Sequence, residues 1–356
     1  MKKVITATVV FALIALAAIG YHRASAHAGG TAPEVPNAKE IIYEHLGDAY
    51  GWELPFNHDL RIPLPIIVKG NSGWHCFMSS RLENGATYEG FRINHGEQYN
   101  NKVVEVASDG SISRPLDLSI TKNVAAIFVC ALIVTLIVLS VKRWYVRNGF
   151  KAPRGGTAAL EFTVDYVYSD TIRPILGKHA PKYAPYLLTV FFFILTMNLM
   201  GLIVIFPGGA NLTGNIAVTM TLAVITFFVI NLSGTREYWK EIFWPDVPMA
   251  LKCPIPMMPL IEILGMFTKP IALMIRLFAN MMGGHMVVLV LMLLIFIFTA
   301  MFNVYVGAAT SVFSLAFTLF MLALDTLVSF IQAYVFTILA TIFISMALVE
   351  PHHEKE

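Results

Sequence analysis

Two long apolar segments near the end of the chain constrain its fold more than any other feature. Residues 271–302 and 311–349 hold 32 and 39 positions, and neither contains the polar break that two separate spans would need. As helices they would measure about 48 and 58 Å, whereas the hydrocarbon core of a bilayer is only about 30 Å thick. The whole chain is 56% hydrophobic and 13% charged, against about 25% charged in ordinary soluble domains. This pattern predicts a membrane protein that ends in a hairpin of two long, strongly tilted helices.

Shorter apolar segments complete a predicted set of about five transmembrane helices. The spans are placed at about 124–141, 186–206, 215–232, 258–302 and 311–349, and a helix at about 157–176 is expected on the cytoplasmic surface. Basic residues follow the first span, and this excess places that end in the cytoplasm: Lys142, Arg143, Arg147, Lys151 and Arg154. Residues 119–356 are therefore predicted to form a multi-pass domain in a bacterial inner membrane, with the C-terminus in the cytoplasm.

The N-terminal part has a different character. Residues 1–26 show the basic start, apolar centre and small-residue cleavage pattern of a secretory signal peptide. Cleavage at Ala26-His27-Ala28 and an uncleaved first anchor stay open as alternatives. Residues 27–118 are polar and carry turn signals such as 70–73 and alternating stretches such as 102–106, which predict a small β-rich domain outside the cytoplasm. The fold class is thus an all-α polytopic membrane protein with a small β-rich N-terminal extracytoplasmic domain.

No cofactor or metal site is expected from the sequence. The three cysteines lie far apart, and the histidines of residues 27–118 show no ligand spacing, so surface histidines are the simpler interpretation. The chain has no Gly-x-x-x-x-Gly-Lys-Ser/Thr phosphate loop. The net charge of +2 gives no reason to expect nucleic acid as a partner.

Few ionisable side chains interrupt the last two segments. Between residues 257 and 349 there are five, tyrosine aside: Glu262, Lys269, Arg276, His285 and Asp325. A charge in the middle of a bilayer costs at least ~2.5–3.5 kcal/mol by insertion scales, so each needs a partner, a water-filled cavity or a function. Lys269 can snorkel to the nearby cytoplasmic end. Arg276 cannot lose its proton, and an internal salt bridge with Glu262 or Asp325 is one explanation for it.

Helical geometry relates these groups to polar neighbours. Asn280 lies one turn beyond Arg276 on the same face, near the small pair Ala279 and Gly283, which lets another helix approach. His285 points about half a rotation away. The last helix carries a polar stripe at i, i+4 and i+7: Asp325, Ser329 and Gln332. A histidine and a carboxylate with water between them can relay protons. Hydrogen bonds that merely pack helices are the alternative for each group alone; together with Arg276 they favour a proton path.

Four segments carry a resemblance to a known family. They are 269–281 (KPIALMIRLFANM), 331–336 (IQAYVF), 197–200 and 215–223, and they resemble subunit a of the F-type ATP synthase over about residues 116–350. The resemblance implies that Arg276 is the essential arginine that faces a rotor ring of c subunits. It implies that His285 and Asp325 line the half-channel open to the external side and that Glu262 lines the cytoplasmic one. Asn280 and Gln332 would lie close to Arg276.

The resemblance also implies a function for the whole chain. It would be a proton-translocating stator, not an enzyme by itself, that couples proton flow to ATP synthesis, with sodium less favoured than protons. Implied partners are the c-ring, peripheral stalk subunit b, the other synthase subunits and the bilayer. The histidine and the acid are exchanged relative to many bacterial members, and residues 27–118 exceed the usual length. That region is left as either a stalk contact or a solvent-exposed elaboration.

Two other functions compete with the stator. An independent ion-coupled transporter or channel predicts internal repeats with paired broken helices, and the sequence shows none. A structural membrane scaffold predicts that Arg276→Lys keeps full coupling, whereas the stator hypothesis predicts its loss.

Overall fold

The computed structural model describes residues 47–54, 57–94, 99, 101–106, 111–149, 151–203, 211–243, 257–301 and 304–348. The predicted signal peptide at 1–26 lies outside the described residues. The chain divides into two compact units. Among the described residues, one unit contains those of Leu289–Thr318, and the other contains the rest.

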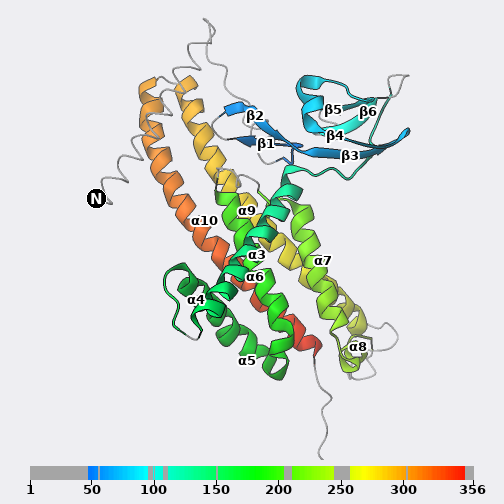
Figure 1. Ribbon diagram of the computed structural model, residues 1–356, viewed down its shortest axis with the longest axis vertical. Helices are drawn as coiled ribbons and strands as arrows, with labels where there is room; N and C mark the ends of the chain where they lie inside the picture. Colours follow the sequence, from blue (N-terminus) through cyan, green and yellow to red (C-terminus); the bar gives the residue numbers. More distant parts are fainter. Residues whose placement is uncertain are drawn as a thin grey trace, which may run out of the picture. The chain divides into compact units, whose positions relative to one another are not determined.

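The larger unit begins with short antiparallel strands, which we call the sheet domain (Figure 1). The strands are β1 Gly51–Leu54, β2 Asn57–Pro63, β3 Pro65–Gly70, β4 Gly73–Met78, β5 Phe91–Asn94, β6 Lys102–Val106, β7 Ile112–Ser113 and β8 Leu116–Asp117, with the 3-10 helix η1 Ser79–Gly85 after β4. They form three small sheets with the orders β1-β2, β4-β3-β8 and β5-β6-β7. The β3–β4 pair closes through the turn between Gly70 and Gly73, and Gly73 takes a positive φ of 119° that glycine adopts without a steric cost.

A small apolar core holds the sheet domain together. Ile66, Phe77 and Phe91 are buried in it, because alternate residues of a strand point to the same face. The Tyr50 hydroxyl donates a hydrogen bond to the Asp117 carboxylate and accepts one from the backbone N–H of Val103. Burial raises the pKa of Tyr50 above its usual value, and the hydrogen bond to Asp117 raises it further. The buried hydroxyl is therefore held in its protonated form.

The rest of the described chain is helical. The elements are α3 Lys122–Asn148, α4 Gly156–Val167, the π-helical turn η2 Tyr168–Ile172, α5 Arg173–Leu176, the 3-10 turn η3 Gly177–His179, α6 Ala180–Leu202, α7 Ile216–Leu232, α8 Arg236–Phe243, α9 Met257–Met301 and α10 Val304–Ala347. In the described residues, four helical stretches are long and apolar enough to cross a membrane, and α7 with α8, bent by 105°, would make a fifth. The prediction of a mostly helical polytopic membrane protein is confirmed.

Some helix ends differ from the predicted spans. The last helix begins at Val304, although the sequence placed its start at residue 311. Thr310 does not interrupt it, because its hydroxyl donates to the carbonyl of Val306 one turn earlier and stays satisfied within the helix. Likewise α6 begins at Ala180 and contains Pro185, where the sequence suggested a boundary. Another proline occupies the first turn of α6, where its missing N–H has no intrahelical partner to lose.

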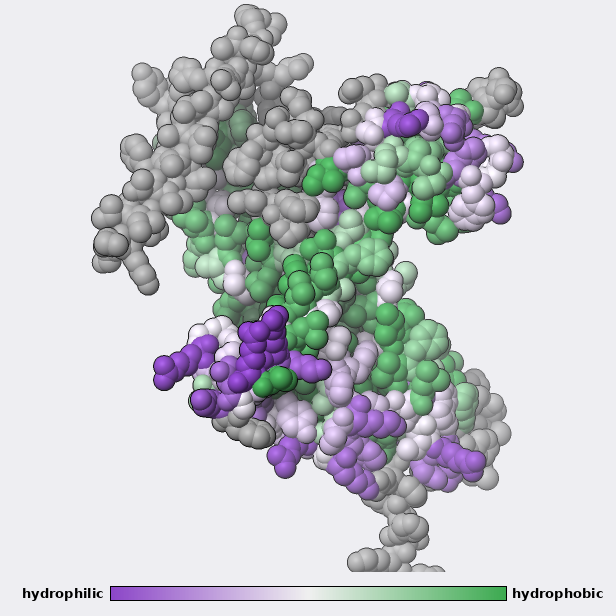
Figure 2. All heavy atoms as spheres, in the orientation of Figure 1, coloured by the Kyte–Doolittle hydropathy of each residue, from purple (hydrophilic) through white to green (hydrophobic). Residues whose placement is uncertain are grey.

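The helices of the larger unit share one apolar core. Side chains of α6 such as Phe191 and Ile194 pack with Leu277 of α9 and Phe336 of α10. Cys130 joins the same core from α3. Figure 2 shows hydrophilic residues gathered around α4 and α5, whereas the surface over α3 and α7 is largely hydrophobic. An apolar surface of this extent is stable against lipid rather than water.

The smaller unit contains the end of α9 and the start of α10. Ser314 donates a side-chain hydrogen bond to the carbonyl of Leu291, which links the two helices. A Cβ added at Gly307 would lie 2.0 Å from Oγ1 of Thr299, so glycine is required for this approach.

Candidate functional site

The central part of α9 has two faces of different composition. Leu273 and Leu277 are buried in the apolar core, and Met281 continues the same face one turn later. The other face is exposed on this chain: Ile275, Arg276, Ala279, Asn280 and Gly283. A Cβ at Gly283 would meet no atom within 4 Å. The small residues of this face are therefore not required by packing within the described part of the chain, which leaves room for a helix of another subunit.

Arg276 is the cation on this exposed face. Among the described residues, no acidic oxygen lies within 4.0 Å of its guanidinium, so the structure does not contain the internal salt bridge with Glu262 or Asp325 considered above. A guanidinium stays charged, and an unpaired charge in a membrane span is costly. The arrangement favours a carboxylate or water supplied from outside this chain.

Polar side chains link α9 to α10 beside Arg276. Asn280 Nδ2 donates to Oε1 of Gln332 over 2.7 Å, so the structure brings these two predicted residues together. Ser329 is fully buried and donates its hydroxyl to the carbonyl of Asp325 over 2.7 Å. Asn198 of α6 donates to the carbonyl of Ser329 over 3.4 Å. Asn198 was not among the predicted site residues, although an asparagine in an apolar span is a usable signal.

Several buried polar atoms near these residues have no hydrogen-bond partner among the described residues: Asn198 Oδ1, Gln332 Nε2 and His285 Nε2. Buried polar atoms in proteins are nearly always paired with protein or water. Unpaired atoms on three helices favour a site that takes up water or protons.

His285 and Asp325 lie at the same junction of α9 and α10. No hydrogen bond joins them among the described side chains. Instead the Asp325 carboxylate rests against Gly284, the residue before His285, because a Cβ at Gly284 would lie 2.6 Å from Oδ1 and 2.8 Å from Oδ2. Gly284 was not among the predicted site residues, since spacing within one helix does not reveal which side chain of a neighbouring helix contacts it.

Glu262 and His285 lie on opposite sides of Arg276 along α9. Glu262 is 14 residues before Arg276 and His285 is nine after it, which correspond to roughly 21 and 14 Å along the helix axis. Glu262 is half-buried in the second turn of α9. Lys269 Nζ lies 5.4 Å from the ring centre of Phe343, so this cation rests against an aromatic ring.

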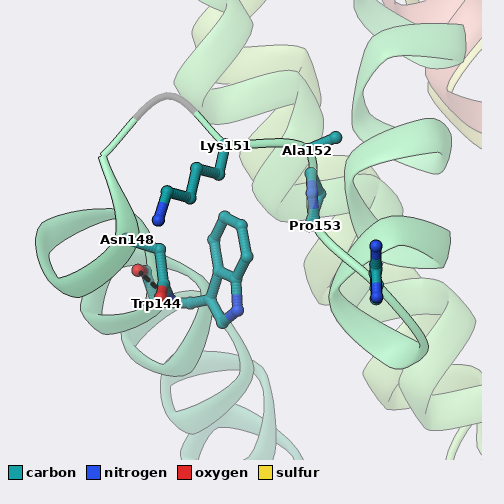
Figure 3. A pocket seen from close by; sticks show the side chains of 6 residues that line it. Trp144, Asn148, Lys151, Ala152 and Pro153 are labelled. Carbon is teal, nitrogen blue, oxygen red and sulfur yellow. Dashed lines mark hydrogen bonds between the residues drawn. The ribbon is translucent and has the colours of Figure 1, made fainter.

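One cavity of the described chain lies away from these residues. It measures about 520 Å³ and is lined by Trp144, Asn148, Lys151, Ala152, Pro153 and Arg154. Figure 3 shows Trp144 and Asn148 on the last turns of α3, where the Asn148 amide donates to the carbonyl of Trp144 over 3.0 Å. None of the predicted site residues lines it. Among the described residues, no group of three or more histidines, cysteines or acids is placed to hold a metal ion.

Comparison with known proteins accounts for the helical part. The family ATP synthase A chain matches residues 124–345. The chain belongs to the ATP synthase A chain family. A relative named ATP synthase subunit a from Chloroherpeton thalassium is 39% identical over 246 residues, 67% of this chain and 70% of the relative. One of the same name from Myxococcus xanthus is 41% identical over 249 residues, 68% of this chain and 77% of the relative.

The sheet domain matches a different family. Residues 41–118 match a domain of unknown function (DUF8433). Membership of the A chain family therefore concerns the helices and their polar residues, and the sheet domain needs its own explanation.

Proposed function

We propose that this A chain is the proton-translocating stator subunit of a rotary F-type ATP synthase and performs no ATP chemistry itself. One observation carries the proposal beyond family membership: Arg276 is exposed on an apolar face of α9 that includes small residues, without an acidic partner among the described residues. A rotor helix that carries a carboxylate fits this face. An independent transporter is not favoured, because the chain belongs to the A chain family.

The exposed arginine controls the charge of the rotor carboxylate. A protonated carboxyl group is neutral and crosses lipid at low cost, whereas the ionised form does not. Arg276 favours the ionised form only where the rotor passes it. Each proton therefore reaches the other side of the membrane only by travelling with the rotor, and the membrane potential supplies ~2.3 kcal/mol per charge per 100 mV.

The other site residues provide access from the two sides of the membrane. We assign His285 and Asp325 to the half-channel that opens externally and Glu262 to the cytoplasmic one. The positions of Glu262 and His285 on opposite sides of Arg276 along α9 support two offset paths. Asn280, Gln332 and Ser329 support the wall between these paths, since Asn280 and Gln332 hold α9 against α10.

The location of the chain follows from its helices and family, which fit a multi-pass protein of a bacterial inner membrane. We propose that residues 1–26 are a signal peptide, that 27–118 lie outside the cytoplasm and that 119–356 form the membrane domain with a cytoplasmic C-terminus. The long helices α9 and α10 form the tilted hairpin against the c-ring. Peripheral stalk subunit b is a further proposed partner.

The test is ATP-driven proton pumping in inverted membrane vesicles that contain the assembled complex. Arg276→Ala is expected to abolish pumping with assembly intact and to add a passive proton leak. Arg143→Ala is the matched control, because it removes an exposed arginine at the end of α3. Normal pumping by Arg276→Ala would remove Arg276 from the mechanism.

A further inference from the structure

The three-stranded sheet β4-β3-β8 carries large apolar side chains on both faces. Its inner face contributes Ile66, Val68 and Phe77 to the core of the sheet domain. A sheet at the surface of a soluble domain normally has polar residues on its outer face. The composition of the outer face therefore needs a separate explanation.

The strand register defines that outer face. Cross-strand partners on it form three rows: Trp74–Lys69–Leu116, Cys76–Ile67–Leu118 and Met78–Pro65–Ile120. Eight of these nine residues are uncharged and apolar. Trp74, Leu116 and Leu118 are 57%, 56% and 59% exposed. The described residues leave these large side chains open on one continuous surface, which we call the outer sheet face.

Lys69 fits the same pattern. Its ammonium group lies 5.7 Å from the ring centre of Trp74, so its aliphatic stem runs over the apolar surface while the charge stays at the edge. Tryptophan and lysine beside aliphatic side chains form the composition that is enriched where proteins meet the headgroup region of a bilayer.

The outer sheet face is also joined rigidly to a membrane span. The backbone N–H of Ile120 donates to the carbonyl of Pro65 over 3.1 Å, and that of Lys122, the first residue of α3, donates to the carbonyl of Ala49 over 2.8 Å. The next N–H, of Asn123, donates to the Asp48 carboxylate over 3.2 Å. The row that contains Ile120 is thus two residues from the helix. In Figure 1 β3 is drawn across the direction of α3.

We propose that the outer sheet face docks on the lipid bilayer, in the leaflet next to which α3 begins. The occupant is a lipid surface because the face is continuous with α3, a helix long and apolar enough to cross a membrane. Aliphatic residues and Trp74 enter the headgroup boundary, and Lys69 lies among the phosphates. This assigns a role to the domain of unknown function that goes beyond the stator activity and does not depend on it.

Cys76 supplies the probe, because it is exposed in the central row of this face. A nitroxide label is attached to Cys76 in the full chain, with Cys253→Ser and with the cysteines of the other subunits replaced. Cys130 is buried. The complex is placed in phosphatidylcholine nanodiscs, and collisions of the label with oxygen and with a water-soluble nickel chelate are measured by power-saturation electron paramagnetic resonance.

Docking on lipid predicts frequent collisions with oxygen and few with the nickel chelate. The matched control is Ala86→Cys with Cys76→Ser, because Ala86 is exposed at the end of η1, and η1 packs Leu82 into the core rather than onto the outer sheet face. Its label is expected to meet the chelate freely. Free access of the chelate to Cys76 would overturn the proposal. Exclusion of both reagents would also overturn it, because a protein subunit would then cover the face.

A second variant tests the same face with the label kept at Cys76. Leu116→Asp with Leu118→Asp places charges on two of the three rows, one of them the row of Cys76, and leaves the buried core unchanged. Exposure of the Cys76 label to the nickel chelate is expected to rise in this variant. An unchanged chelate exposure would contradict docking through these rows.

Discussion

Where α9 and α10 meet, two polar side chains of α10 are buried, whereas Arg276 of α9 is exposed. On α10, Ser329 and Gln332 are 0% and 4% exposed, and each makes a hydrogen bond. On α9, Arg276 points away from the core and has no acidic partner among the described residues. Gln332 links the two helices through Asn280, and Ser329 bonds within α10, whereas Arg276 makes no salt bridge in the described part of the chain. The proposed functional arginine is thus distinguished by the absence of an acidic partner in the described residues, not by a dense cluster of polar groups.

The largest effect is expected at Arg276, where a substitution should change proton pumping but not the stability of the subunit. Arg276→Ala is expected to abolish coupled pumping while the thermal unfolding temperature of the isolated subunit in detergent stays unchanged, because Arg276 makes no salt bridge within the described chain. The same measurement on Gln332→Ala should show a lower unfolding temperature, since Asn280 loses its partner. A large destabilisation by Arg276→Ala would break the comparison.

A smaller effect on proton pumping is expected where the Asp325 carboxylate of α10 contacts α9. Gly284→Ala pushes the Asp325 carboxylate away from its position against α9, and a misplaced proton-transfer group should slow ATP-driven pumping roughly 10- to 100-fold. Gly265→Ala is the control on the same helix, because a Cβ there meets no atom within 4 Å. Equal pumping by the two variants would show that the position of Asp325 is unimportant.

The hydrogen bond between Asn280 and Gln332 should have a smaller effect, measured as a coupling energy. A double-mutant cycle of Asn280→Ala and Gln332→Ala, followed by reversible unfolding in detergent, is expected to give a coupling energy of about 0.6–1.7 kcal/mol, the range of interhelical hydrogen bonds in membrane proteins. A coupling energy of zero would mean that this hydrogen bond does not hold α9 to α10.

The smallest effect at neutral pH is expected at Tyr50, a buried side chain of the sheet domain. The raised pKa of Tyr50 means that folding favours the protonated hydroxyl. This stability is fully present below the ordinary tyrosine pKa of about 10 and is lost as the pH rises above it. Between about pH 8 and 11, the wild type should therefore lose more thermal stability than Tyr50→Phe. Parallel losses would contradict a buried, protonated Tyr50.

The sequence predicted the helices better than their contacts. Apolar runs locate the helices because a segment that spans lipid must be apolar. The positions of Arg276, Asn280 and Gln332 along their helices followed from spacing and resemblance. The partner of Asp325 did not, because Gly284 is 41 residues away and the register between two helices depends on packing. Helix α10 begins at Val304, seven residues before the predicted span at 311–349. The sheet domain gave only turns and alternation, and these do not specify which strands pair.

The short connection between β8 and α3 has a mechanical consequence. A single helix surrounded by lipid can spin about its own axis, and a turning rotor exerts torque on every part of its stator. Hydrogen bonds from Ile120, Lys122 and Asn123 tie the start of α3 to the sheet domain at three points. The width of the sheet therefore acts as a lever arm, and rotating α3 would require dragging the whole sheet domain around with it.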